Sequence, residues 1–152
     1  MGSTYTTNGG IEKIGLGEQA GAWGTTTNNN FDIIDRLING VGSVSLSSSA
    51  AAHDLTTSDG SLSDGMFKVI TFTGATEACT ITIKDESSAK LYFIKNGSGQ
   101  TLTFRQGSGG TVGNNRAVAI ADGKGAIIFA DGGGGSAIVT DLTTLIVTGK
   151  HF

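Results

Sequence analysis

The sequence has no proline, a single cysteine and two histidines in 152 residues. Without proline, tight turns depend on residues that tolerate positive φ, and 25 glycines are available for them. One cysteine excludes an intramolecular disulfide, and two histidines without cysteine partners do not make a closed zinc site. A domain of this length can bury roughly 68–70% of its unfolded surface, so a hydrophobic core is possible without such cross-links.

Charge and long hydrophobic runs are also scarce. Charged residues make up 15% of the chain, the formal net charge is -3, and lysine and arginine form no runs. This balance provides no field to attract DNA or RNA, so we expect no nucleic-acid partner. No segment approaches the ~18 apolar residues of a membrane helix, and no basic-then-apolar signal peptide opens the chain. We therefore expect no membrane partner and no export by that route.

The body of the chain reads as β-structure. From Val41 onward, apolar and polar residues alternate in short runs that glycine-containing turns separate. The predicted strands include 67–73, 79–84, 91–95, 101–105, 117–121, 126–130, 137–140 and 145–147. The run 91–95 is apolar on both faces, which predicts a central strand, and turn residues 96–100 predict a hairpin with 101–105. A glycine-rich loop is expected over 107–115.

The N-terminal region has a different character. Residues 1–30 are polar and rich in glycine, which predicts an extended arm. Asn30 is a good N-cap and Gly40 a good C-terminal residue for a short helix over about 31–39. Phe31, Ile34 and Ile38 share one face of this helix, which is too short to persist unless that face docks on something.

These patterns predict an all-β fold. With no second helix to cross over, we expect antiparallel sheets forming a β-sandwich or a jelly-roll-like barrel, with an extended N-terminal arm and one short helix. The predicted division is an attachment segment over 1–40, containing the arm and the helix, and a β-domain over 41–152.

Residues that could carry catalysis are few and scattered. His53 stands beside Asp54, but no Gly-x-Ser-x-Gly elbow accompanies the pair. The acids Glu77, Asp85 and Glu86 lie in turn-like polar stretches typical of isolated surface carboxylates. The glycine pattern at 15–21 lacks the spacing and the strand–helix context of a dinucleotide fingerprint. We expect no catalytic residue, no cofactor and no enzymatic activity.

Two further signals favour structural roles. Asp59, Asp64, Asp122 and Asp131 each precede glycine, which favours hairpin-type turns over calcium loops, so no metal site is expected. Cys79 shares one face of its strand with Ile81 and Ile83, which predicts a buried small hydrophobe rather than a nucleophile.

Residues 21–34 (GAWGTTTNNNFDII) are the most distinctive segment and contain the only tryptophan. The segment resembles one common near the N-terminus of tailed-phage virion proteins, with a Gly-x-Trp-Gly core, a Thr/Asn-rich stretch, an aromatic residue and an acidic-aliphatic helix. Phe31 stands where tryptophan is commoner in that pattern. Residues 91–98 and 102–104 are also similar, and the resemblance runs over roughly 4–142.

The resemblance implies a non-enzymatic structural protein of a bacteriophage virion, made in the host bacterial cytoplasm. Because the chain ends at Phe152 without a long shaft, it favours a short tail fibre, a tail adaptor, or a capsid spike or decoration protein. The expected partners are further copies of the chain, as a homotrimer, and other virion proteins of the tail or capsid. The expected attachment residues are Trp23, Thr25, Asn28, Asn30, Phe31, Ile34 and Ile38.

Two other classes of function remain open at this stage. A carbohydrate-binding receptor-recognition module of the phage tail would bind a host surface glycan on a concave patch containing Trp23, Tyr92 or other exposed aromatics. An enzyme such as a depolymerase would need carboxylates that converge in a cleft.

Overall fold

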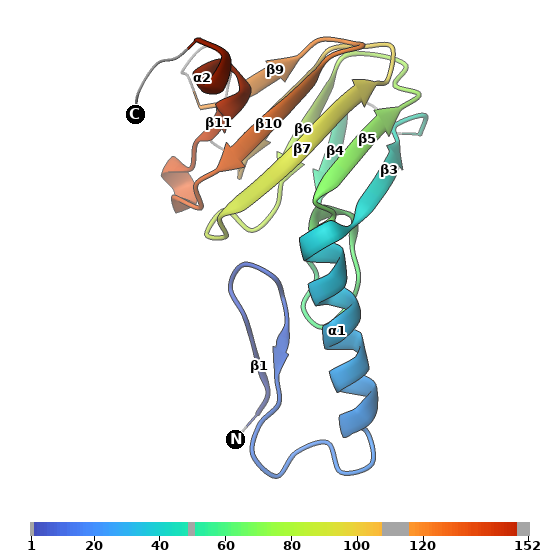
Figure 1. The fold of residues 1–152 in the computed structure, drawn as a ribbon, viewed down its shortest axis with the longest axis vertical. Helices are drawn as coiled ribbons and strands as arrows, with labels where there is room; N and C mark the ends of the chain where they lie inside the picture. The colour runs from blue at the N-terminus through green and yellow to red at the C-terminus, as the bar shows by residue number, and fades with distance from the viewer. Residues whose placement is uncertain (1, 49–50, 108–115, 149–152) are drawn as a thin grey trace.

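The computed structural model describes residues 2–48, 51–107 and 116–148, and Figure 1 shows its ribbon. Two sheets stand above an N-terminal stalk made of a small hairpin and a long helix. The helices are α1 (Trp23–Asn39) and α2 (Leu142–Thr148), with short 3-10 turns η1 (Asp64–Met66) and η3 (Gly134–Ser136). The strands are β1 (Thr4–Tyr5), β2 (Glu12–Lys13), β3 (Val41–Ser45), β4 (Ala52–Leu55), β5 (Val69–Thr73), β6 (Cys79–Ile83), β7 (Lys90–Gly97), β8 (Leu102–Gln106), β9 (Val118–Ile120), β10 (Gly125–Ala130) and β11 (Val139–Asp141).

The main strands alternate between two sheets as the chain advances. One sheet has the order β11-β10-β7-β5-β3 and the other β4-β6-β8-β9, while β1 and β2 pair alone. From β3 to β8 each successive strand joins the opposite sheet, so this part of the chain winds as a coil. After β8 this alternation stops: β9 joins the second sheet beside β8, and β10 and β11 both join the first sheet.

The prediction of antiparallel sheets is wrong for the central strands. β3, β5 and β7 are parallel to one another, and so are β4, β6 and β8, while β10 with β7, β10 with β11 and β8 with β9 are antiparallel. Parallel neighbours need a crossover, which is usually a helix. Here the crossover between two strands of one sheet is a strand of the other sheet, so no crossover helix is needed.

The predicted hairpin between 91–95 and 101–105 is also wrong, because β7 and β8 lie in different sheets. The turn between them is a corner around the fully buried Asn96. The Asn96 side-chain amide donates to the carbonyls of Gln100 and Ile120, each at 2.8 Å, and its oxygen accepts from Ser98. The prediction that 91–95 is central is confirmed, since β7 lies between β10 and β5.

A single core fills the space between the two sheets. Phe72 of β5 and Phe104 of β8 meet edge to face, with ring centroids 5.5 Å apart. Cys79 is buried in this core together with Ile81 and Ile83, which confirms the prediction for that strand. The β-rich character of the prediction is confirmed, although the mixed sheets are not those of an antiparallel sandwich or a jelly roll, and the strands of the described residues do not close into a barrel.

The helix near the N-terminus is longer than predicted. α1 begins at Trp23 rather than Phe31 and has 17 residues, about 26 Å at roughly 1.5 Å per residue. Asn30 is therefore an interior residue and not the N-cap. The predicted end is confirmed, because α1 ends at Asn39. Gly40 has an extended backbone, and a Cβ there would lie 2.4 Å from the Arg36 carbonyl oxygen.

The predicted strand 145–147 is wrong, since these residues belong to α2, which lies against β10. Asp141 starts this helix: its carboxylate accepts from the Thr143 backbone amide at 2.8 Å, and the Thr143 hydroxyl accepts from the Ile127 amide at 2.7 Å. The glycine-rich loop expected over 107–115 lies almost wholly outside the described residues.

Candidate functional site

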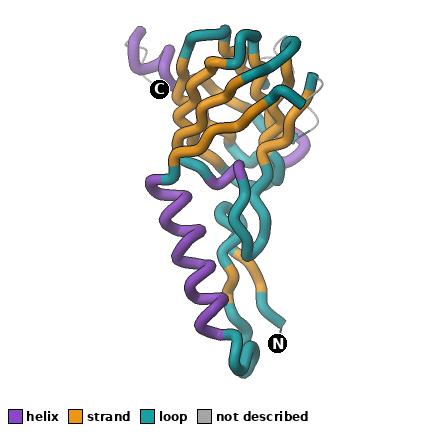
Figure 2. The backbone as a smooth tube through the Cα atoms, turned by 90° about the vertical axis from the view of Figure 1, so that its right-hand side faces the viewer, coloured by secondary structure: helices purple, strands orange, loops and turns teal. Residues whose placement is uncertain are grey.

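The stalk, residues 2–40, is the part of the chain that holds every predicted attachment residue. In Figures 1 and 2 the β1–β2 hairpin and α1 run side by side below the two sheets. The hairpin replaces the extended arm expected from the sequence. It is held by its own chain: the Gly60 backbone amide donates to the Gly10 carbonyl at 2.7 Å, and the Ser3 hydroxyl donates to Glu18 at 3.0 Å.

Asn30 attaches the hairpin to the helix. Its side-chain oxygen accepts from the Glu12 backbone amide at 2.9 Å, and its side-chain nitrogen donates to the Glu12 carbonyl at 2.8 Å. The Asn30 side chain therefore bonds to both backbone groups of Glu12, the N–H and the C=O, as the backbone of a neighbouring strand would. Gln19 adds a second link, because it donates to the Glu12 carboxylate and accepts from the Thr26 hydroxyl. Asn30 and Thr26 are poor helix formers, but inside α1 their side chains make hydrogen bonds to residues outside the helix.

The hydrophobic face of α1 has two parts with different surroundings. Ile33 is fully buried, and Leu37 is half-buried beside the hairpin tip, where a Cβ on Gly9 would meet it at 2.8 Å. Phe31 and Ile38 are instead 62% and 59% exposed, and Ile34 is also exposed. The rest of the described chain therefore leaves more than half of Phe31 and Ile38 uncovered, and 36% of Ile34.

The three exposed residues, together with the half-buried Thr27, follow a heptad rhythm. Thr27, Phe31, Ile34 and Ile38 are spaced by four, three and four residues, which is the seam pattern of a coiled coil. Phe31 and Ile38 then take the a positions, and Thr27 and Ile34 the d positions. We call these four residues the α1 seam. Trp23, 61% exposed, lies at the start of the helix one turn before the seam.

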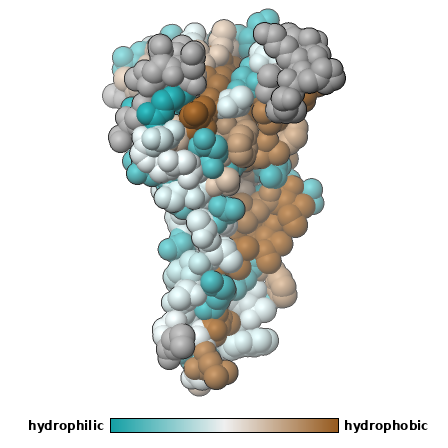
Figure 3. All heavy atoms as spheres, turned by 90° about the vertical axis from the view of Figure 1, so that its left-hand side faces the viewer, coloured by the Kyte–Doolittle hydropathy of each residue, from teal (hydrophilic) through white to brown (hydrophobic). Residues whose placement is uncertain are grey.

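The hydrophobic surface continues from the α1 seam onto the outer face of the first sheet. Val41, just after the helix, is 70% exposed and pairs with Val69. Val69 pairs with Phe93, and Phe93 with Ile127, so four apolar side chains form one row across β3, β5, β7 and β10. Figure 3 shows hydrophobic surface gathered along one edge of the molecule, from the stalk up to the sheets. Patches of this kind on a single chain mark interaction sites.

The structure divides the predicted attachment residues into three groups. It brings Phe31, Ile34 and Ile38 together on one face, with Trp23 near its lower end. It turns Asn30 toward the hairpin. Thr25 is exposed on the opposite side of the helix, about 180° around the axis from Ile34 at 100° per residue. Asn28 is exposed at the e position that flanks the seam, about 60° from Phe31.

Sequence reasoning missed the part of this surface that lies on the sheet. Val41, Val69, Phe93 and Ile127 come from four separate strands, and only the register of those strands aligns them. Strand alternation offered a partial signal, since Phe93 and Ile127 each occupy the outward position of an apolar run. That signal does not reveal which strands are neighbours.

Candidate catalytic groups do not converge in the described residues. His53 contacts Asp64 at 2.9 Å rather than its sequence neighbour Asp54, which pairs with Lys84 at 3.1 Å. Asp64 also accepts from the Thr56 backbone amide at 2.9 Å, so it organises a loop. No group of three or more His, Cys, Asp or Glu side chains able to hold a metal ion occurs in the described ranges.

The aspartates before glycine act as turn residues. Asp131 accepts from the backbone amides of Gly133 and Ile138, each at 2.9 Å, and Asp122 accepts from the Gly99 amide at 2.8 Å. These carboxylates accept hydrogen bonds from backbone amides of the loops, as expected for residues that form turns.

The glycan patch considered from the sequence does not include Tyr92. Its ring is buried, its hydroxyl donates to the Gly65 carbonyl at 2.7 Å, and burial raises its pKa above the ordinary value, with a smaller contribution from Asp64. Trp23 lies alone at the far end of the helix from the sheets. The two aromatics do not share a surface on which a sugar could stack.

Comparison with protein-family models, with curated proteins and with solved structures gives no match to this chain. Neither described helix is long and apolar enough to cross a membrane.

Proposed function

We propose that this chain is a non-enzymatic structural component of a bacteriophage virion, which assembles through the hydrophobic surface of its stalk. The observation that carries the proposal is the α1 seam, in which Phe31 and Ile38 are 62% and 59% exposed and Ile34 36% exposed. Burying a fully exposed side chain of this size contributes about 1.5–3 kcal/mol, so burying the parts of these side chains that are still exposed favours a partner on this face. The resemblance of residues 21–34 to tailed-phage virion proteins supports the class of particle.

The partner that best fits the seam is the same helix from two further copies. Isoleucine at both a and d positions shifts coiled coils from dimers toward trimers and tetramers, and Ile34 and Ile38 occupy one of each. A rotationally symmetric trimer with parallel helices would bring the three seams together on its axis. The seam spans only two heptads, so the row from Val41 to Ile127 has to extend the contact for the assembly to be stable.

This arrangement assigns different roles to the other predicted attachment residues. Thr25 lies opposite the seam, so in the trimer it remains on the outside of the stalk, while Asn28 lies at the edge of the seam. Thr25 is therefore available to other virion proteins of the tail or the capsid. Asn30 instead holds the β1–β2 hairpin against α1 through its two hydrogen bonds to Glu12.

The oligomer is tested by the mass of the purified full-length chain in solution, measured by light scattering after size exclusion. We expect three copies of the 15.4 kDa chain. The double variant Ile34→Glu/Ile38→Glu places charges at the centre of the seam, and we expect it to run as a monomer with its β-sheet circular dichroism unchanged. The matched control Thr25→Glu/Asn29→Glu adds the same charge at the exposed b and f positions, away from the seam, and is expected to stay trimeric. A monomeric parent chain, or a control that dissociates as fully as the seam variant, would contradict the trimer.

The location is tested on particles. Antibody labelling of this chain in intact phage particles is expected to mark the tail or the capsid, and the labelled position decides between those two. Absence of the chain from purified particles would overturn the virion assignment.

A further inference from the structure

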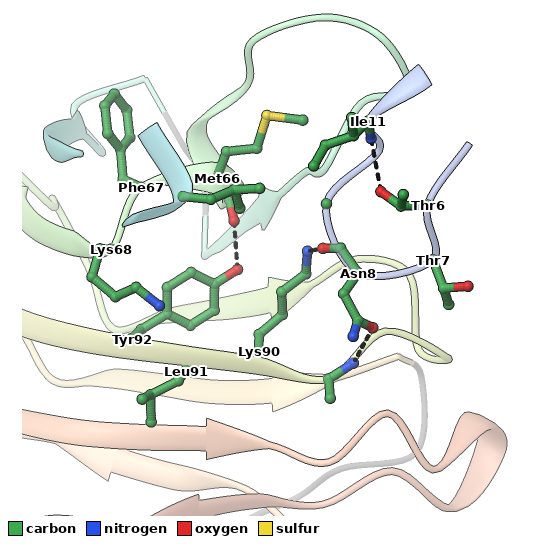
Figure 4. Close-up of a pocket in the computed structure, with 14 residues that line it drawn as sticks. Thr6, Thr7, Asn8, Ile11, Met66, Phe67, Lys68, Lys90, Leu91 and Tyr92 are labelled. Carbon is green, nitrogen blue, oxygen red and sulfur yellow. Dashed lines mark hydrogen bonds between the residues drawn. The ribbon is translucent and has the colours of Figure 1, made fainter. Parts of the chain in front are cut away.

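A cavity of about 540 Å³ lies where the stalk meets the sheets (Figure 4). The tip of the β1–β2 hairpin, the end of α1, η1 with the segment after it, and the beginning of β7 all contribute to its lining. These segments come from distant parts of the sequence, so the cavity exists only in the folded chain. Its volume is within the range of about 300–1,000 Å³ typical of small-molecule sites.

Two lysines line this cavity. Lys90 at the start of β7 is only 7% exposed, and its ammonium donates to the Asn8 carbonyl at the hairpin tip. Lys68 lies just before β5, and Figure 4 shows the two side chains extending on either side of the Tyr92 ring. Burial lowers the pKa of Lys90 to about 8; Asp85 opposes this shift and Lys68 adds to it.

Neither lysine forms a close ion pair in the described residues, although Asp85 acts on Lys90 from farther away. Within the described ranges, no carboxylate oxygen lies within 4.0 Å of either ammonium, and the Lys68 side chain makes no hydrogen bond. The chain as a whole carries a net charge of -3, so the concentration of positive charge here is local. Two lysines beside one partly desolvated cavity create a field that favours an anion.

The remaining walls suit an organic body attached to that anion. Met66 is buried, and Phe67, Leu37 and Ile11 supply further hydrophobic surface. Asn8 is held in place because its side-chain oxygen accepts from the Ala89 backbone amide at 3.2 Å. The cavity therefore combines a fixed polar rim, apolar walls and a cationic side, which are the usual elements of a small-molecule site.

We propose that this cavity binds a small organic anion, a carboxylate or phosphate group carried on a body about the size of one sugar ring. Lysine ammonium groups act as point charges rather than planar forks, so they suit a carboxylate and a phosphate alike. Acidic sugars present the first group and sugar phosphates the second. This role is separate from the assembly role of the α1 seam.

The test is calorimetric titration of the intact full-length chain with glucuronate, with glucose 6-phosphate and with neutral glucose. We expect saturable binding of at least one anion and none of glucose. The anion that binds more tightly shows whether the cavity prefers a carboxylate or a phosphate. Lys68→Met removes one cation without breaking a hydrogen bond, and it is expected to weaken binding by about tenfold or more. The matched control is Lys95→Met, which removes the same charge from the exposed outer face of β7. Its affinity is expected to stay near that of the parent chain.

A second readout follows Lys90 itself. A bound anion stabilises the charged ammonium, so the pKa of Lys90, followed by NMR of its side chain, is expected to rise on saturation. Lys68 and Asp85 are the charged groups that act on this lysine, and the Lys68→Met variant measures the first contribution directly. The proposal is overturned if neither anion binds better than glucose, or if Lys95→Met weakens binding as much as Lys68→Met.

Discussion

Replacement of Asn30 by alanine tests how the stalk is held together. The carboxamide makes two hydrogen bonds to the backbone of Glu12, at 2.9 and 2.8 Å, from a half-buried position inside α1. A hydrogen bond of this type contributes about 0.5–1.5 kcal/mol net, so the pair contributes about 1–3 kcal/mol. Alanine is the better helix former by about 0.5 kcal/mol, which offsets part of the loss. We expect Asn30→Ala to weaken docking of the hairpin by about 0.5–2.5 kcal/mol.

Amide hydrogen exchange measures this directly, because the hairpin can open while the sheets stay folded. The informative amides are those of Glu12, which bonds to Asn30, and of Gly10, which bonds to the Thr6 carbonyl at 3.0 Å. Each 1.4 kcal/mol of lost docking corresponds to about tenfold faster exchange. Amides of the core strands are expected to keep their protection.

Asn28→Ala is the matched control in the same helix. Asn28 is exposed, and its side chain makes no hydrogen bond within the described residues. This substitution changes only helix propensity, so it is expected to stabilise the stalk by about 0.5 kcal/mol and leave the hairpin protected. Unchanged protection of the hairpin in Asn30→Ala, or an equal loss in Asn28→Ala, would refute the reasoning.

Four further substitutions test other parts of the structure. Because the pKa of Lys90 is about 8 in the folded chain and 10.5 when unfolded, the folded state binds fewer protons between these values. The stability of the parent chain relative to Lys90→Met, from urea titrations, is expected to rise with pH over that interval by up to about 3 kcal/mol, and a falling difference would contradict it. Gly42→Ala places a Cβ 2.3 Å from the Phe67 ring, so we expect Tm to fall by about 3–10 °C, whereas Gly24→Ala, with open space around it inside α1, is expected to raise Tm. Asn96→Ala leaves buried groups at the β7–β8 corner unpaired and is expected to lower the free energy of unfolding in urea by about 3 kcal/mol or more; a loss below 1 kcal/mol would contradict the role of this corner.

Local patterns in the sequence were sufficient to locate most of the strands. The alternation in 79–84 and 126–130 predicts β6 and β10 closely, and it also predicts the burial of Cys79. The end of α1 before Gly40 follows from the same kind of local signal. Such features depend on neighbours in the chain, which the sequence displays directly.

The start of α1 depends on contacts that are distant in sequence. The run 25–30 consists of threonine and asparagine, which favour caps and turns over helix interiors. Bonds from Thr26 to Gln19 and from Asn30 to Glu12 hold these residues in helix. Asn30 therefore has the local character of an N-cap, but in the folded chain it is an interior residue of α1.

The sequence by itself determined the β-rich body, the position of most strands and the exceptional character of residues 21–39. Only the tertiary structure decided that the sheets are mixed, because Asn96 turns the chain into the opposite sheet instead of back along β7. It also decided the two surfaces proposed here for binding. The apolar row from Val41 to Ile127 and the cavity between Lys68 and Lys90 combine residues from separate elements. Such neighbours follow from strand register and from the packing of the stalk, which depend on contacts far apart in the sequence.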